Sequence, residues 1–294
     1  MPGSTFGEIP VASAAELLNI LSPLDTEAWP DKEHVFRGQP DATMPLEASA
    51  HRLRGRIDAA STFGRKAVPA GHQVLFEASL LRSFLQGCDR SGLVVPGDMP
   101  GFRDALQSSM LSFMNQPQEW PRRELYQILA VAQHHGIPTC FLDWTWRSYV
   151  AAYFAASTAL GMPVPPSHLA IWALNVSNHR SWQGLGFVQM PGGTSSNLAA
   201  QAGVFTVSKI TQKATETFIP TNFVSAGQNG HAVSLLKYVL PFDQAVPLLE
   251  GCHRLGVSGA TLFPGYEGVA REVQDLANMG RQTVDWGEIT PRDT

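Results

Sequence analysis

Gln133–Thr145 reads Gln-His-His-Gly-Ile-Pro-Thr-Cys-Phe-Leu-Asp-Trp-Thr. It holds two imidazoles, an amide, a carboxylate, an indole and two hydroxyls. The segment before it has helical apolar spacing, and the segment after it is rich in alanine. The stretch is therefore predicted to be a polar connection between two buried helices.

The helix before this stretch is predicted from Leu125, Ile128, Leu129 and Ala132, which follow i, i+3, i+4, i+7 spacing. Pro121 suits its start, and Gly136 and Pro138 end it, so His134 and His135 fall in its last turn. There the negative end of the helix dipole favours imidazolium. A short strand at Phe141–Asp143 and a helix at Tyr149–Leu160, capped by Thr145 or Ser148, should follow.

A second polar stretch, Val35-Phe36-Arg37-Gly38-Gln39, ends a short strand predicted at His34–Gly38. We expect the two stretches to build one site. Downstream, Arg52, Arg54 and Arg56 form a small basic cluster. It is either a solvated face or a clamp for a phosphate or another substrate group.

The remaining elements indicate one α+β domain over residues 1–294, with a helical N-terminal half packed on a mixed β-sheet. Met1–Pro10 is expected to be a loose leader and Asn178–Ala200 a lid over a ligand. Further helices are expected at Ser13–Leu21, Val74–Leu85, Phe102–Met114, Asp243–Arg254 and Glu267–Met279, and further strands at Leu169–Val176, Val204–Ser208, Val233–Leu240 and Val257–Phe263.

Composition restricts the classes of protein to consider. With 44% hydrophobic residues, 16% charged residues and a net charge of −4, the chain has no broad positive field for nucleic acid, so such contacts would be local. Three scattered cysteines favour a reducing compartment. No signal peptide or membrane-spanning run is visible, so we expect a cytoplasmic protein without a membrane partner.

Several common catalytic motifs are absent. The sequence has no nucleophile elbow, Walker loop, dinucleotide fingerprint or His-Glu-x-x-His motif. His134 and His135 are adjacent and would point about 100° apart on a helix. No metal site is therefore expected.

Two motifs resemble those of the FRG domain family: Phe36-Arg37-Gly38-Gln39 and Gln133-His134-x-Gly136-x-Pro138-Thr139-x-x-Leu142-Asp143-Trp144-Thr145. Supporting segments extend the resemblance over a core of about residues 17–276. The chain departs from the family pattern at three places. Cys140 stands where the family usually has Arg, Ala48-Ser49 stands for Pro-Ser, and Gly265-Tyr266-Glu267-Gly268 stands for Asp-Leu-Asp-Gly.

The same residues are similar to motifs of ADP-ribosyltransferases. Arg37 would correspond to the arginine that braces NAD, and Asp143-Trp144-Thr145, with the helix that carries Tyr153, to the second motif. The third motif is a catalytic Glu on a later strand. Gln201 stands near that position, and Glu267, expected at the end of a strand, and Asp143 are the other candidates.

This resemblance implies an NAD-dependent mono-ADP-ribosyltransferase-like enzyme that modifies RNA, DNA or protein, as a toxin or antiphage defence effector with an antitoxin or other regulatory partner. NAD would be the co-substrate. Cleavage of its nicotinamide–ribose bond places positive charge on the sugar, which a fixed carboxylate stabilises. The expected catalytic residues are Arg37, Asp143 and Glu267, and the expected NAD-binding residues are Gln39, Gln133, His134, His135, Thr139, Trp144, Thr145, Tyr153 and Gln201.

Each role has a structural alternative. Arg37 can form an ion pair with Glu77 or Asp143, and Asp143 can cap the following helix. Trp144 can belong to the core, one histidine can be buried with the other at the rim, and Glu267 can be an N-terminal helix charge. A non-catalytic nucleotide- or partner-binding module and an NAD glycohydrolase are therefore the alternative functions.

Overall fold

The computed structural model describes residues 5–53, 68–99, 103, 106, 111–221, 223–224 and 233–283. A mixed seven-stranded sheet with the order β1-β7-β4-β2-β3-β6-β5 lies at its centre. β1 pairs with β7 in parallel, and the other pairings in the sheet are antiparallel. The strands are β1 (Thr5–Pro10), β2 (His34–Gln39), β3 (Phe141–Thr145), β4 (His168–Asn175), β5 (Leu185–Val188), β6 (Gly203–Ser208) and β7 (Ser234–Pro241).

Helices surround this sheet, so the fold is α+β, as predicted. The α-helices are α1 (Ala14–Ile20), α2 (Ser49–Leu53), α3 (Ala70–Arg90), α5 (Tyr126–His134), α6 (Ser148–Leu160), α7 (Ser196–Ala200), α9 (Ala245–Arg254), α10 (Gly259–Leu262) and α11 (Tyr266–Thr283). Short 3-10 helices are η1 (Pro117–Glu119), η2 (Arg123–Leu125), η3 (His179–Ser181), η4 (Gly192–Thr194) and η5 (Phe242–Gln244). None of the described helices is long and apolar enough to cross a membrane.

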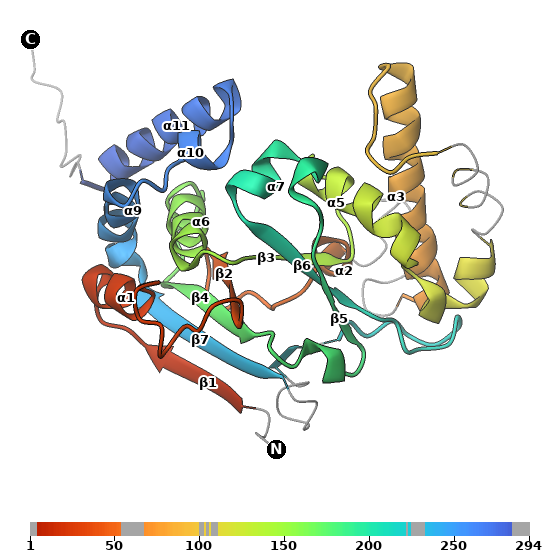
Figure 1. Cartoon of the computed structure of the whole chain (residues 1–294), viewed down its shortest axis with the longest axis horizontal. Helices are drawn as coiled ribbons and strands as arrows, with labels where there is room; N and C mark the ends of the chain where they lie inside the picture. Colours follow the sequence, from red (N-terminus) through yellow and green to blue (C-terminus); the bar gives the residue numbers. More distant parts are fainter. Residues whose placement is uncertain are drawn as a thin grey trace, which may run out of the picture.

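The helices form two groups over the sheet. α1, α6 and α9 pack on one half through residues such as Phe36 and Ile171, whereas α3 and α5 pack on the other half through Phe141 and Phe205. A third cluster, rich in tryptophan, is built on side chains such as Trp144 and Trp172. Figure 1 shows α9, α10 and α11 at one end of the molecule and α3 and α5 at the other.

The sheet opens between β2 and β3. These two strands share one registered pair, Phe36 with Thr145, whereas β2 and β4 share six pairs and β3 and β6 share five. The part of β2 after Phe36, from Arg37 to Gln39, therefore lies without ladder pairing to β3. This opening separates the two halves of the sheet and places the side chains of β2 and β3 along its sides.

The prediction for the N-terminal end was wrong. Thr5–Pro10 is not a loose leader but the edge strand β1, because its backbone pairs with β7. The first half of the chain, predicted to be mainly helical with strands at His34–Gly38 and Phe141–Asp143, contributes β1 as well as β2 and β3. Asn178–Ala200, predicted to be a lid over a ligand, contains β5 and α7.

The strand predicted at Val257–Phe263 is instead the helix α10. Ser258 and Thr261 form a capping box at its start, in which the Ser258 amide donates to Thr261 Oγ1 at 2.9 Å. Gly259 lets this helix pack against α11, because a Cβ at that position would lie 2.7 Å from the amide nitrogen of Glu272. Glu267 consequently lies in the first turn of α11 and not at a strand end.

Two predictions fall partly on residues outside the described ranges. Arg54 and Arg56 of the basic cluster lie outside the described residues, as does most of the helix predicted at Phe102–Met114. The helix predicted at Val74–Leu85 is confirmed as part of α3.

Candidate functional site

A pocket of about 510 Å³ lies at the opening between β2 and β3. Side chains from β2, β3, α5, α6, α7 and α11 line it. Nine of the predicted site residues are among them: Arg37, Gln39, Gln133, His134, Asp143, Trp144, Thr145, Gln201 and Glu267. The expectation that the two polar stretches meet at one place is confirmed by this geometry.

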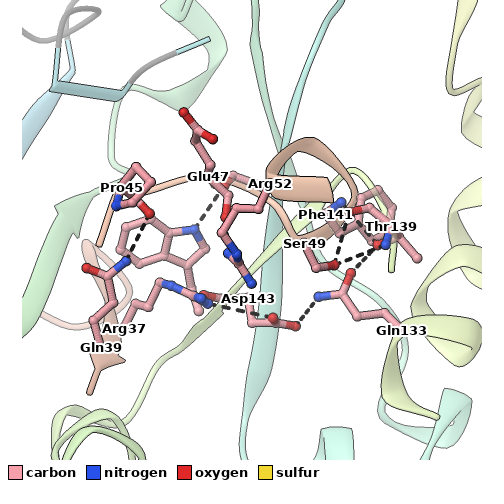
Figure 2. Close-up of polar contacts among 12 residues, drawn as sticks. Arg37, Gln39, Pro45, Glu47, Ser49, Arg52, Gln133, Thr139, Phe141 and Asp143 are labelled. Carbon is pink, nitrogen blue, oxygen red and sulfur yellow. Dashed lines mark hydrogen bonds and ion pairs between the residues drawn. The ribbon is translucent and has the colours of Figure 1, made fainter. Parts of the chain in front are cut away.

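Arg37 and Asp143 meet across the opening (Figure 2). The Arg37 Nη1 donates to the backbone oxygen of Asp143 at 2.9 Å and lies 3.6 Å from its Oδ2, which makes an ion pair but not a good hydrogen bond. Burial lowers the pKa of Arg37 and Arg52 lowers it further, whereas Asp143 opposes this shift. Arg37 remains charged at any working pH.

Gln133 holds the carboxylate of Asp143 from the other side (Figure 2). Its Nε2 donates to Asp143 Oδ1, and its Oε1 accepts a hydrogen bond from Thr139 Oγ1. Thr139 in turn donates its backbone amide to Ser49 Oγ at 3.1 Å. Thr139 is buried and does not line the pocket. It therefore positions Gln133 and is not one of the pocket-lining residues that could contact NAD.

The residues after Arg37 fix the position of β2. A Cβ on Gly38 would lie 2.0 Å from the backbone oxygen of Ala151, so only glycine lets β2 lie so close to α6. Gln39 is buried; its Nε2 donates to the Pro45 carbonyl at 3.3 Å, and its Oε1 accepts from Trp172 Nε1 at 2.6 Å. Both hydrogen-bonding groups of the Gln39 amide therefore have protein partners.

Residues 32–161 match the model of the FRG domain family. This match includes both polar stretches and the contacts between them. The chain carries an FRG domain. No curated protein and no solved structure matches the chain.

Thr145, within the FRG match, contacts Gln201, which lies after it, and so connects β3 to the turn before β6. Thr145 Oγ1 donates to the backbone oxygen of Gln201 at 2.6 Å, and Gln201 Nε2 donates to the backbone oxygen of Leu262 at 3.2 Å. Trp144 is 3% exposed, and its Nε1 donates to Thr206 Oγ1 at 2.9 Å. The indole of Trp144 therefore belongs to the core and does not offer a free face for stacking.

The FRG motif residue His134 and its neighbour His135 differ in their surroundings. His134 lines the pocket, and its Nε2 accepts a hydrogen bond from Asn197 Nδ2 at 2.6 Å. Burial first, and then the charge of His135, lower the pKa of His134, so burial outweighs the helix dipole that was expected to favour imidazolium. His135 is exposed, stacks on Phe84 and does not line the pocket.

The far wall of the pocket comes from α11. Arg271 Nη2 lies 2.9 Å from Glu267 Oε1, and the Arg271 guanidinium lies 4.0 Å from the ring centre of Phe263. Tyr153, expected to bind NAD, does not line the pocket, and its hydroxyl donates to the buried Asp275 at 2.7 Å. Phe154, the next residue, does line it.

The chemistry of Cys140 differs from that of the usual FRG arginine. The thiol is buried beside Glu77, and burial first and then Glu77 raise its pKa. Glu77 receives hydrogen bonds from Gln73 Nε2 at 2.9 Å and Trp120 Nε1 at 2.8 Å, and His51 Nε2 lies 3.5 Å from it. His51 is thus a titratable neighbour that the structure places against this buried carboxylate. In the described parts of the chain, no cluster of three or more His, Cys, Asp or Glu residues could hold a metal ion.

Sequence reasoning missed several pocket residues: Phe154, Asn197, Phe263 and Arg271. Arg52 also lines the pocket, in keeping with one of the two alternatives for the basic cluster. A helical signal was available for Phe154, because it lies three residues after Ala151 and four before Thr158, both of which line the same wall. The same signal was available for Arg271, which lies four residues after Glu267 on α11. Asn197 reaches the pocket through tertiary packing, which no local pattern in the sequence indicates.

Proposed function

We propose that this FRG domain protein is an NAD-dependent mono-ADP-ribosyltransferase-like enzyme with an ADP-ribosyltransferase-like core built around β2 and β3. The observation that carries the proposal is that Arg37, Asp143, Thr145 and Glu267, from β2, β3 and α11, line one pocket. A guanidinium, a fixed carboxylate and a hydroxyl in one cavity are the groups that this chemistry needs.

The residues present fit an NAD molecule. A volume of about 510 Å³ is within the range of pockets that hold ligands of this size. Arg37 has donors to spare for phosphate oxygens, since its one described hydrogen bond runs to a backbone carbonyl. Phe154 and Phe263, which lie edge to face with ring centres 6.0 Å apart, replace Trp144 and Tyr153 as candidates for aromatic contact.

Of the two carboxylates that line the pocket among the described residues, Asp143 is the one we assign to stabilising positive charge on the ribose. NAD supplies the activated bond between ribose and nicotinamide. The Asp143 carboxylate contacts both Gln133 and Arg37, so its oxygens are fixed before a ligand arrives. Glu267, in the first turn of α11, has one described partner, Arg271, whereas two residues on different elements hold Asp143.

A non-catalytic nucleotide-binding module is the second candidate function. Gln201 stands near the position of the third-motif Glu, and its amide donates to the Leu262 carbonyl. A neutral, structurally engaged amide cannot stabilise positive charge as a carboxylate does. In this second reading the pocket binds the nucleotide without cleaving it.

Incubation with NAD labelled in its adenylate part tests the proposal, with total RNA, DNA and cell protein as separate acceptors. Label transfer and nicotinamide release are measured. Asp143→Asn should lower both by about a hundredfold, and Arg37→Ala should weaken NAD binding. Arg254→Gln, on an 83% exposed side chain in α9, is the matched control and should leave both unchanged.

Each outcome points to one function. Nicotinamide release without label transfer identifies a glycohydrolase. NAD binding without release identifies the binding module. The absence of binding, release and transfer in the wild-type protein contradicts the proposal.

A further inference from the structure

Arg52 places a second guanidinium in the pocket, beside the FRG motif arginine. It lies in the last turn of α2, and its Nη1 donates to the backbone oxygen of Glu47 at 2.5 Å. Within the described ranges, no carboxylate lies within ion-pair distance of Arg52. Figure 2 shows its side chain extending toward Asp143, on the same side as Arg37.

The short helix that carries Arg52 is held at three successive residues. Ser49 Oγ accepts from the Thr139 amide at 3.1 Å, and the Ala50 amide donates to the Thr139 carbonyl at 3.1 Å. The Ala50 carbonyl accepts from Gln73 Nε2 at 3.2 Å, and His51 lies against Glu77. Arg52 therefore projects from a base that is fixed to the second FRG motif and to α3.

Arg37 retains unused donor capacity on its side of the pocket. Its side chain is 17% exposed, and its buried Nε has no hydrogen-bond partner among the residues that the structure describes. A buried donor without a partner costs free energy that a ligand oxygen would recover. The charge of Arg52 also disfavours that of Arg37, which contributes to the lowered pKa of Arg37.

The charges that line the pocket leave one cation in excess. Arg37 pairs with Asp143 and Arg271 pairs with Glu267, which leaves Arg52 uncompensated by a lining carboxylate among the described residues. Two guanidinium groups held near each other repel, and an anion bound between them offsets that repulsion. Each planar guanidinium can bind two oxygens of a phosphate group.

We propose that Arg37 and Arg52 together form an anion subsite that binds the diphosphate of a nucleoside diphosphate unit, one phosphate group against each guanidinium. The inference deepens the proposed function, on which it rests for the identity of the complete ligand. The role assigned to Arg52 in phosphate binding does not depend on any bond being cleaved.

Calorimetric titration of the full chain with ADP, inorganic pyrophosphate and adenosine tests the subsite. The wild-type protein should bind ADP at least about tenfold more tightly than adenosine, and pyrophosphate should compete with ADP. Arg52→Gln should weaken binding of ADP and pyrophosphate about tenfold and leave adenosine binding unchanged. Arg52→Lys, which keeps the charge but loses the planar fork, should give an intermediate loss for ADP.

Arg254→Gln is again the control, and thermal unfolding of each variant shows that it folds. Added salt should weaken ADP binding less in Arg52→Gln than in the wild-type protein, because one ionic contact is gone. Equal ADP affinity of wild type and Arg52→Gln overturns the inference. So does wild-type protein that binds neither ADP nor pyrophosphate.

The two proposals fail in different ways. If ADP binding depends on Arg52 but NAD is neither cleaved nor transferred, the subsite stands and the enzymatic proposal fails. If NAD is transferred by the wild-type protein and by Arg52→Gln at equal rates and equal KM, the enzyme stands and the subsite fails.

Discussion

Glu77 is 2% exposed, and the groups that enclose its carboxylate determine its pKa. Burial alone would raise its pKa. His51, together with hydrogen bonds from Gln73 and Trp120, outweighs burial and holds the pKa of Glu77 below its ordinary value of 4.5. Glu77 is therefore charged in the folded state at neutral pH, and it anchors α2 to α3 through His51.

Glu77→Gln should destabilise the protein by about 3 kcal/mol at neutral pH, because it removes a buried carboxylate that accepts hydrogen bonds from Gln73 and Trp120. The pKa of Glu77 is lower in the folded than in the unfolded state. Its stabilising contribution is therefore fully present above the unfolded pKa and is lost as the pH falls through the folded pKa. Urea unfolding should be measured from about pH 7 to about pH 3. The difference in free energy of unfolding between wild type and Glu77→Gln should be constant at the higher pH values and should narrow below about pH 4.5.

Glu250→Gln is the control for this experiment, since the carboxylate of Glu250 is 53% exposed and lies 3.8 Å from Arg254. That substitution should change stability by less than about 0.5 kcal/mol. A stability difference between wild type and Glu77→Gln that grows on acidification would contradict the role given to the buried pair.

At the scale of single residues, the sequence predicted that Arg37 and Asp143 meet, but not which neighbouring side chains are open to the pocket. Side chains alternate along β3, where Asp143 is exposed and Trp144, although it lines the pocket, is buried. Tyr153 and Phe154 differ in a similar way. The Tyr153 hydroxyl donates to Asp275, whereas Phe154 lines the pocket. These differences depend on the orientation of the element, which the motif alone does not give.

Contacts between whole elements depend on glycine at two places. Gly38 lets β2 lie against α6, and Gly259 and Gly268 let α10 lie against α11. A Cβ on Gly268 would lie 1.9 Å from the backbone oxygen of Phe263. The first contact positions Arg37, and the second positions Glu267, the residue next to Gly268.

Gly38→Ala should destabilise the protein by about 3 kcal/mol, since the added methyl group meets the backbone of Ala151 and cannot be accommodated by a side-chain rotation. Thermal unfolding measures this change. Gly193→Ala is the control, because a Cβ there meets nothing within 4 Å, and it should remain within about 0.5 kcal/mol of wild type. Equal stability of the two variants would show that β2 can move away from α6 at no cost.

The sequence predicted the strands β4, β6 and β7 well. β4 and β6 have continuous buried runs, whereas buried and half-buried residues are interspersed along β7. The sequence failed at α10, where the β-prone residues of Val257–Phe263 are overruled by a capping box and by packing on α11. It also missed β1 and β5 at the sheet edges. β1 pairs with a strand near the other end of the chain, Thr5 opposite Ser234, which local patterns do not reveal.

At the scale of the whole molecule, the residues that match the family do not include all the strands of the central sheet. Residues 32–161 contain β2 and β3, whereas their partners β4 and β6 lie after that range. A fragment of residues 32–161 should therefore lack a cooperative thermal transition by circular dichroism, while the full chain shows one. A fragment that unfolds cooperatively, with the same protected amides as the full chain, would show that the matched range is an independent folding unit.

The pairing of β1 with β7 has a consequence for solubility. β1 satisfies the outer backbone groups of β7, a strand with the apolar residues Leu235, Leu236 and Val239. A variant that begins after Pro10 would leave this strand as an open template for intermolecular pairing. Light scattering should then show self-association that increases with concentration, even when the pocket residues are intact.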